Sequence, residues 1–196
     1  ADCVMLTELN IHDNATLTSI GNSAFQGCNS IKEYVVHAST TNVGNSAFSG
    51  CSYLETVRFA PNGQQVTFGT GVFRNCDRLT TIQLPATLAA FDGSVFDGCE
   101  HIYNVEVDPN NQHLETYKNA LYTKGLTELI YYPRNLDGDL TQLPWDTLTK
   151  IGPSVFKGNR KITSVVIGAK VTEIGNNAFD TCINLASVTF ANANSA

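Results

Sequence analysis

The residues of this sequence most able to do chemistry are its six cysteines, which recur at regular intervals. They are Cys3, Cys28, Cys51, Cys76, Cys99 and Cys182, and neighbours among the first five lie 23 or 25 residues apart. Thiols can bind zinc, pair as disulfides or act as nucleophiles. A zinc site needs four converging ligands, often in closely spaced pairs, so this long and even spacing argues against a metal site.

Catalysis by a cysteine needs a base beside the thiol, and the four histidines fall at positions unrelated to the cysteines. Equivalent positions of a stacked repeat form a row, in which a free cysteine behaves as a small buried hydrophobic residue. Packing is therefore the favoured interpretation. Disulfides between adjacent cysteines remain an open alternative, although parallel side chains must rotate to bond. Asn159 holds the seventh equivalent position, so we expect polar backbone within reach of its amide.

The cysteines belong to a repeated phrase, seen as "IGNSAFQGC" at Ile20 and as "IGNNAFDTC" at Ile174. Its Phe recurs at residues 25, 48, 73, 96, 156 and 179, in steps of 23, 25, 23, 60 and 23. The long step is one unit plus a 37-residue insertion. A unit this short cannot bury its apolar face alone, so the repetition predicts a solenoid in which stacked units share one core.

Each unit reads apolar-x-x-x-x-Phe-x-x-Cys-x-x-Leu-x-x-Leu-x-Leu. The closing Leu-x-Leu has the period of two that sends apolar side chains to one face of a strand. The Gly-Asn pair before each Ser-Ala-Phe, as at Gly21-Asn22, predicts a turn and a helix N-cap. Phe and Cys three residues apart share a face of one helical turn. Each unit is thus predicted to be a short strand, a turn and a brief helical or 3₁₀ segment.

The composition excludes several classes of partner. The 196 residues are 42% hydrophobic, and their net charge of -6 argues against nucleic acid and anionic membrane surfaces. No apolar stretch approaches the length of a membrane span. Because Cys3 fits the middle of a unit, we expect residues 1–196 to be one domain from a longer array, with the insertion at 109–147.

The phrase "IGNSAFQGCNSI" and the strand half "LTTIQLP" resemble the BspA-like (treponemal-type) leucine-rich repeat family. The resemblance implies an α/β fold, a right-handed solenoid of about seven 23-residue coils with a parallel concave sheet. It also implies short helical or 3₁₀ segments, an inserted β-hairpin and a place on a secreted or cell-surface protein that serves adhesion. The family offers no catalytic residues and no cofactor to transfer. Asn159 in place of Cys and Asp92 in place of Gly are departures from its pattern.

Candidate binding residues come from the outward positions of the predicted sheet, because concave solenoid faces usually bind ligands. They are Glu33, Thr56, Arg58, Thr81, Gln83, Asn104 and Glu106. The insertion adds Tyr131 and Tyr132, at the end of a hairpin expected over 120–124 and 126–132. Amphipathic aromatic residues are enriched in binding hot spots, but a lone hairpin also needs aromatic packing, so both roles stay open for these tyrosines.

The sequence predicts a monomeric, non-enzymatic module that binds a host or microbial surface protein or a glycan. One alternative is a structural spacer with no ligand of its own. An enzyme would need a clustered histidine or carboxylate site, and the repeat places none. Asn14 begins a glycosylation sequon, and Asp137-Gly138-Asp139 is interpreted as a turn, since two carboxylates are too few for calcium.

Overall fold

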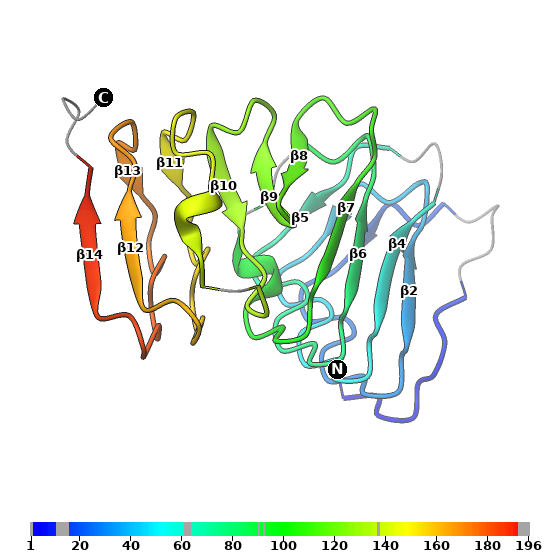
Figure 1. Cartoon of the computed structure of the whole chain (residues 1–196). Helices are drawn as coiled ribbons and strands as arrows, with labels where there is room; N and C mark the ends of the chain where they lie inside the picture. The colour runs from blue at the N-terminus through cyan, green and yellow to red at the C-terminus, as the bar shows by residue number, and fades with distance from the viewer. Residues whose placement is uncertain are drawn as a thin grey trace.

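The computed structural model of the chain describes residues 2–10, 16–60, 64–89, 91, 93–136 and 138–191 (Figure 1). Its chain winds into a solenoid of about seven turns, most of which combine a longer strand with a shorter one. The predicted leucine-rich-repeat solenoid with parallel sheets is confirmed. The predicted sequon at Asn14, together with Asp92 and Asp137, lies outside the described residues.

The longer strands form the front sheet, and they lie where the Leu-x-Leu pattern predicts them. They are β2 (Glu33–Val36), β4 (Thr56–Phe59), β6 (Thr81–Leu84), β7 (Asn104–Val107), β12 (Ser164–Ile167) and β14 (Ser187–Phe190). The first four pair in parallel in the order β2-β4-β6-β7, and β12 pairs in parallel with β14. Tyr34 and Val36 are buried whereas Glu33 and Val35 are exposed, as a period of two requires.

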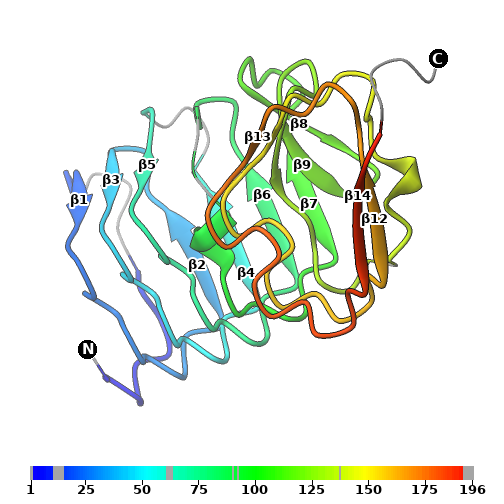
Figure 2. The same ribbon diagram turned by 90° about the vertical axis from the view of Figure 1, so that its left-hand side faces the viewer.

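The shorter strands form a back sheet on the other side of the core. They are β1 (Ser19–Ile20), β3 (Asn42–Val43), β5 (Thr67–Phe68), β11 (Lys150–Ile151) and β13 (Glu173–Ile174). The first three pair in parallel from coil to coil, as do the last two. Figure 2 shows β1, β3 and β5 following one another in successive coils. The core therefore lies between two ladders of parallel strands.

The segments that follow the short strands are mostly turns. Of the helical or 3₁₀ segments expected around the Phe of each unit, the described residues contain one, the 3₁₀ turn η1 (Gly93–Phe96), and a second 3₁₀ turn, η2 (Leu140–Gln142), lies in the insertion. Elsewhere a residue with φ near +55°, such as Ser23 (54°) or Ser46 (55°), interrupts any helix, because L-residues visit the left-handed region singly.

The predicted N-cap role of the Gly-Asn asparagine is wrong. Its side chain instead accepts a hydrogen bond from the backbone of the next coil. The backbone amide of Asn45 donates to Asn22 Oδ1 at 2.8 Å, and the backbone amide of Thr70 donates to Asn45 Oδ1 at 2.9 Å. With no helix following the turn, there are no free N–H groups of a first helical turn to cap, so the asparagine joins coil to coil.

The insertion contains the predicted hairpin and one further strand. The hairpin strands β9 (Ala120–Thr123) and β10 (Glu128–Tyr131) are antiparallel, and β8 (Leu114–Tyr117), which was not predicted, pairs with β9. β10 also pairs in parallel with β11, so the insertion continues the back sheet. Among the described residues no strand pairing joins β7 to β12, and η2 lies beside β12 (Figure 1). The insertion thus interrupts the front sheet and extends the part of the back sheet formed by β11 and β13, which no strand pairing joins to β5 among the described residues.

A ladder of aromatic rings runs through the core, and the insertion supplies the missing rung. Ring centroids along it are 5.2 Å apart for Phe25–Phe48, 5.7 Å for Phe48–Phe73, 5.9 Å for Phe73–Phe96 and 5.0 Å for Phe156–Phe179. Between Phe96 and Phe156 stand Tyr131, 5.4 Å from Phe96, and Tyr132, 5.3 Å from Phe156. Adjacent residues of one chain therefore bridge two coils.

The insertion also divides the hydrophobic core into two clusters. Leu121 and Tyr131 pack with the coils that precede the insertion, whereas Tyr122 and Tyr132 pack with those that follow it. Successive residues of a strand point to opposite faces, so one strand can pack against both hydrophobic clusters. This use of both faces explains why the insertion is rich in apolar residues on either side of its strands.

The cysteines are free, and all but Cys3 are buried. Four of the thiols donate to the carbonyl oxygen of a Phe in the preceding coil, at 3.1 Å for Cys51 to Phe25 and 3.0 Å for Cys182 to Phe156, and likewise for Cys76 and Cys99. Packing with a weak hydrogen bond is thus their observed role. Asn159 Oδ1 accepts from the backbone amides of residues 161 and 162 at 2.8 and 3.1 Å, so the expected backbone partners are present for the oxygen, whereas Nδ2 is buried without a hydrogen-bond partner in the described part of the chain.

A cluster of charges joins the coils on both sides of the insertion. The Asp97 carboxylate lies 3.0 Å from Arg134, 2.9 Å from Lys157 and 3.9 Å from Arg74. Its side chain is only 13% exposed, so these ion pairs are less screened by solvent than ordinary surface pairs. The Asp97 carboxylate therefore links its own coil to the coils of Arg74 and Lys157 and, through Arg134, to the insertion.

Candidate binding surface

Seven of the predicted binding residues lie on the outer face of the front sheet. Glu33, Thr56, Thr81 and Asn104 are cross-strand neighbours and form one row over β2, β4, β6 and β7. The second row holds Arg58, beside Val35, and Gln83, beside Glu106. Parallel pairing without slippage produces this alignment, because every coil places its Leu-x-Leu at the same register.

Side-chain contacts hold much of this face in place. Arg58 Nε lies 3.1 Å from Glu33 Oε1. The side-chain amide of Gln83 donates to Glu106 Oε2 at 2.9 Å, and the side-chain amide of Asn104 donates to Glu106 Oε1 at 2.7 Å. The bonds from Asn104 and Gln83 stabilise the charged carboxylate and lower the pKa of Glu106. The acceptor is thus ionised and oriented before any ligand arrives.

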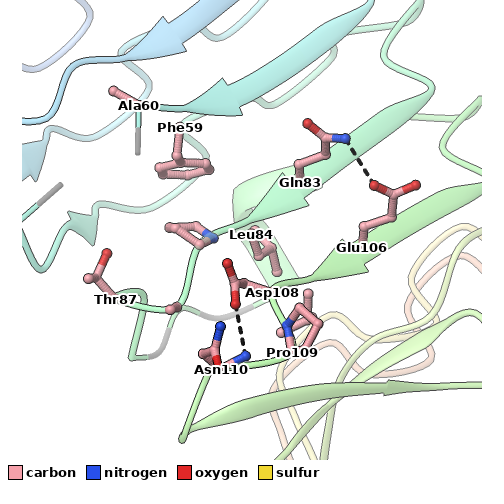
Figure 3. A pocket seen from close by; sticks show the side chains of 12 residues that line it. Phe59, Ala60, Gln83, Leu84, Thr87, Glu106, Asp108, Pro109 and Asn110 are labelled. Carbon is pink, nitrogen blue, oxygen red and sulfur yellow. Dashed lines mark hydrogen bonds between the residues drawn. The ribbon is translucent and has the colours of Figure 1, made fainter. Parts of the chain in front are cut away.

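A groove opens where β4, β6 and β7 end (Figure 3). It has a volume of about 610 Å³. Apolar side chains line its floor, Gln83 and Glu106 lie at one rim, and the turn that follows β7 lies at the other. The apolar and turn residues concerned are Phe59, Leu84, Pro85, Val107, Asp108, Pro109 and Asn110. The predicted row of polar residues therefore leads into a hollow with a different chemistry.

One buried asparagine fixes the wall of this groove. Asn111 is fully buried, and its Nδ2 donates to the carbonyl oxygens of Pro85 at 2.7 Å and Leu88 at 3.0 Å. Its Oδ1 accepts from the backbone amides of residues 113 and 114, both at 2.7 Å. The backbone amide of Asn110 donates to Asp108 Oδ1 at 2.8 Å. These bonds position the 108–110 turn against the end of β6.

Sequence reasoning identified the two rows but missed the groove. Phe59, Leu84 and Val107 are the last residues of their strands, but the rest of the lining lies in the turns that follow, where the units differ in length and the repeat no longer aligns them. The signal that could have found it is the pair of prolines, Pro85 and Pro109, one after β6 and one after β7. Proline ends strand pairing because it has no N–H to donate.

The structure corrects the assignment of Tyr131 and Tyr132 as binding residues. Their exposed fractions are 5% and 3%, because both rings belong to the aromatic ladder. The packing role that the sequence left open is the one observed. Tyr117, at 39% exposure, is the insertion tyrosine that reaches the surface most clearly.

The repeat architecture agrees with a known family. A family model for the BspA type leucine-rich repeat region matches residues 1–129 and 140–196 in six copies. The chain belongs to this BspA-type family. The unmatched residues 130–139 fall inside the insertion, at the point where Tyr131 and Tyr132 replace the regular Phe rung.

Solved structures resemble this BspA-type array in fold. The pneumococcal vaccine antigen PcpA matches with a TM-score of 0.75 and 22% identity, over 88% of this chain and 42% of its own. A leucine-rich cell surface protein from Faecalibacterium prausnitzii matches with a TM-score of 0.67 and 22% identity, over 97% of this chain and 56% of its own. The chain thus spans about half the length of these neighbours. No curated protein matches it.

The front face of this BspA-type array presents hydrogen-bonding, charged and apolar groups. Within the described residues, no group of three or more histidine, cysteine, aspartate or glutamate side chains converges as a metal site would require. The same part of the chain has no helix long and apolar enough to cross a bilayer. The front face and its groove therefore offer hydrogen bonds, charge and apolar surface.

Proposed function

We propose that this chain is a non-enzymatic binding module, and that the front face of its solenoid contacts a surface protein or a glycan of a host or a microbe. The observation that carries the proposal is the ordered polar face that leads into an open groove. Glu33, Arg58, Gln83, Asn104 and Glu106 hold one another in place there. Groups that are already oriented lose less entropy when they bind.

The setting we propose is a secreted or cell-surface protein, in which the chain acts as a monomer. Two similar folds support it, since one is described as a vaccine antigen and the other as a cell surface protein. Adhesion is the activity that such a setting favours. We also propose that residues 1–196 fold as one domain that includes the insertion at 109–147, and a single calorimetric unfolding transition would support this.

The test is binding of the purified chain to a panel of extracellular-matrix proteins, bacterial surfaces and glycans. One variant changes Arg58, Gln83 and Glu106 to alanine. The matched control changes Asn42, Thr67 and Glu173, which are exposed on the back sheet, to alanine. We expect the front variant to lose binding while the control keeps it. Equal binding by both variants would contradict the front-face proposal, and no binding by the native chain would favour a spacer.

A further inference from the structure

The groove at the ends of β4, β6 and β7 carries negative charge that the protein does not neutralise. Its lining includes the carboxylates of Glu106 and Asp108 but no lysine, arginine or histidine. In the described part of the chain, neither carboxylate forms an ion pair with a basic side chain, and their hydrogen bonds come from amides. The site therefore holds two acceptors with a net charge of about -2 at neutral pH.

The one cation nearby on the same face is engaged elsewhere. Arg58 pairs with Glu33 at 3.1 Å, on the side of β4 away from the groove. Arg58 and Glu106 lie two strands apart in their row, which is roughly 10 Å at the usual strand spacing. Glu33 is thus neutralised by a neighbour, whereas Glu106 faces an open hollow without such a neighbour.

The floor between these carboxylates suits an alkyl chain. Phe59, Leu84 and Val107 end the three strands and line the groove. Leu84 is almost fully buried in the core, so the partly exposed Phe59 and Val107 offer the apolar surface at the strand ends. The width of three strands, roughly 10 Å, admits one long side chain but not a helix. Lysine and arginine place their methylene stems on apolar surface while the charged head reaches polar groups.

We propose that this groove binds a lysine or arginine side chain, flanked by apolar residues, from a polypeptide partner. The inference rests on the proposed function and names the class of ligand. A neutral sugar could use the same acceptors, but it would leave both charges of this groove, which is lined by no basic side chain, without a counterion. A cation satisfies the charge as well as the hydrogen bonds, and charge-assisted bonds are roughly twice as strong as neutral ones.

The test uses a blocked peptide, acetyl-Gly-Leu-Arg-Leu-Gly-amide, and a matched peptide in which citrulline replaces arginine. Citrulline keeps the shape and loses the charge. Backbone amide shifts of the ¹⁵N-labelled chain would be followed during titration with each peptide. We expect the arginine peptide to shift the amides of residues 83–87 and 106–110, and to bind about tenfold more tightly than its citrulline match. Its affinity should fall as the ionic strength rises.

The matched variants are Glu106→Gln with Asp108→Asn, and, as control, Glu55→Gln with Asp77→Asn. Both pairs remove two exposed carboxylates of equal charge. Asparagine at 108 keeps the oxygen that accepts the single bond from Asn110, whereas glutamine at 106 keeps one of the two bonds that Glu106 accepts on separate oxygens. The groove variant should lose the preference for arginine, and the control should keep it. Unchanged thermal midpoints would show that both variants are folded.

Equal binding of the arginine and citrulline peptides would overturn the inference. So would shifts confined to residues outside the groove, or a glycan that competes at 106–110 while the arginine peptide does not bind. These outcomes do not contradict the proposed function, because that proposal is tested by the panel experiment with the alanine variants. Panel binding without a charge preference in the groove would refute this inference alone.

Discussion

The thiol of Cys99 lies 2.9 Å from the carbonyl oxygen of Phe73, one coil earlier in the solenoid. The same bond joins Cys76 to Phe48 at 3.2 Å. Each of these carbonyls also accepts the backbone N–H of the cysteine in its own coil, so the thiol is a second, weak donor on a side chain small enough for the narrow space between coils. Recurrence of cysteine at this position therefore reflects packing together with hydrogen bonding, and requires neither metal nor oxidation.

The burial of these thiols predicts their reactivity. Cys3 is exposed, whereas the other five are buried, and burial raises the pKa of the Cys51 thiol to about 12. Only the thiolate reacts quickly, so we expect a thiol reagent at pH 8 to modify one cysteine in the native protein. Unfolding without reductant should release all six. A total of four or two would mean that adjacent rungs are bridged by disulfides.

Truncating a rung of the aromatic ladder should be costly. Phe96 is 1% exposed and contacts both Phe73 and Tyr131, so Phe96→Ala is expected to lower the free energy of unfolding by about 3–5 kcal/mol. The matched control is Phe190→Ala, at a ring that is 63% exposed, which should change it by less than about 1 kcal/mol. Urea denaturation measures both. Similar losses in the two variants would contradict the core assigned here.

Removing the Tyr131 hydroxyl should not destabilise the protein. The Tyr131 ring is buried, and its hydroxyl has no hydrogen-bond partner within the described part of the chain. A buried polar group without a partner is destabilising, so Tyr131→Phe should leave the stability unchanged or raise it by about 1 kcal/mol. Tyr131→Ala should lower it by about 3–5 kcal/mol. A clear loss in the phenylalanine variant would reveal a partner for the hydroxyl.

The wall of the groove should depend on Asn111. Asn111→Ala leaves two backbone carbonyls and two amides without their side-chain partner, and we expect a loss of about 3 kcal/mol in the free energy of unfolding. Asn111→Asp keeps the acceptor but places an oxygen against the two carbonyls, so it should also destabilise. The exposed neighbour provides the control, since Asn110→Ala should cost less than about 0.5 kcal/mol.

The titration of Glu106 should report its hydrogen bonds. Because Asn104 and Gln83 lower its pKa in the folded state, the ionised carboxylate contributes stability above the ordinary value of 4.5 and loses it as the pH falls through the lowered value. We expect an NMR titration of its side-chain carbon to give a midpoint below 4.5. Asn104→Ala should move the midpoint upward. A midpoint at or above 4.5 in the native protein would contradict these bonds.

Much of the fold follows from the repeat because each apolar position is specified several times over. The strands around Tyr34, Val57 and Ile82 lie where the pattern places them, and the row from Glu33 to Asn104 follows from the same register. The insertion lacks this redundancy. A single copy gave no sign that β8 pairs with β9, or that Tyr131 and Tyr132 replace a rung of the ladder.

The groove was beyond prediction for a related reason. Asn111 lies 26 residues from Pro85, and nothing in the local sequence marks it as a buried residue that joins the two segments. Polar residues are mostly exposed, and a buried one is recognised only when its partners are known. The candidate surface was therefore predictable where it repeats and unpredictable where two unlike segments meet.

The position of Asp97 has a mechanical consequence. Its carboxylate ties Arg74, Arg134 and Lys157 across the place where the front sheet is interrupted, so the ion pairs cross the joint that strand pairing leaves open. Tension applied along the axis of the array would load this joint through the pairing of β10 with β11 and through the ion pairs that Asp97 and Glu100 form with Arg134 and that Asp97 forms with Lys157. The joint should thus stiffen at low ionic strength and yield more easily in concentrated salt.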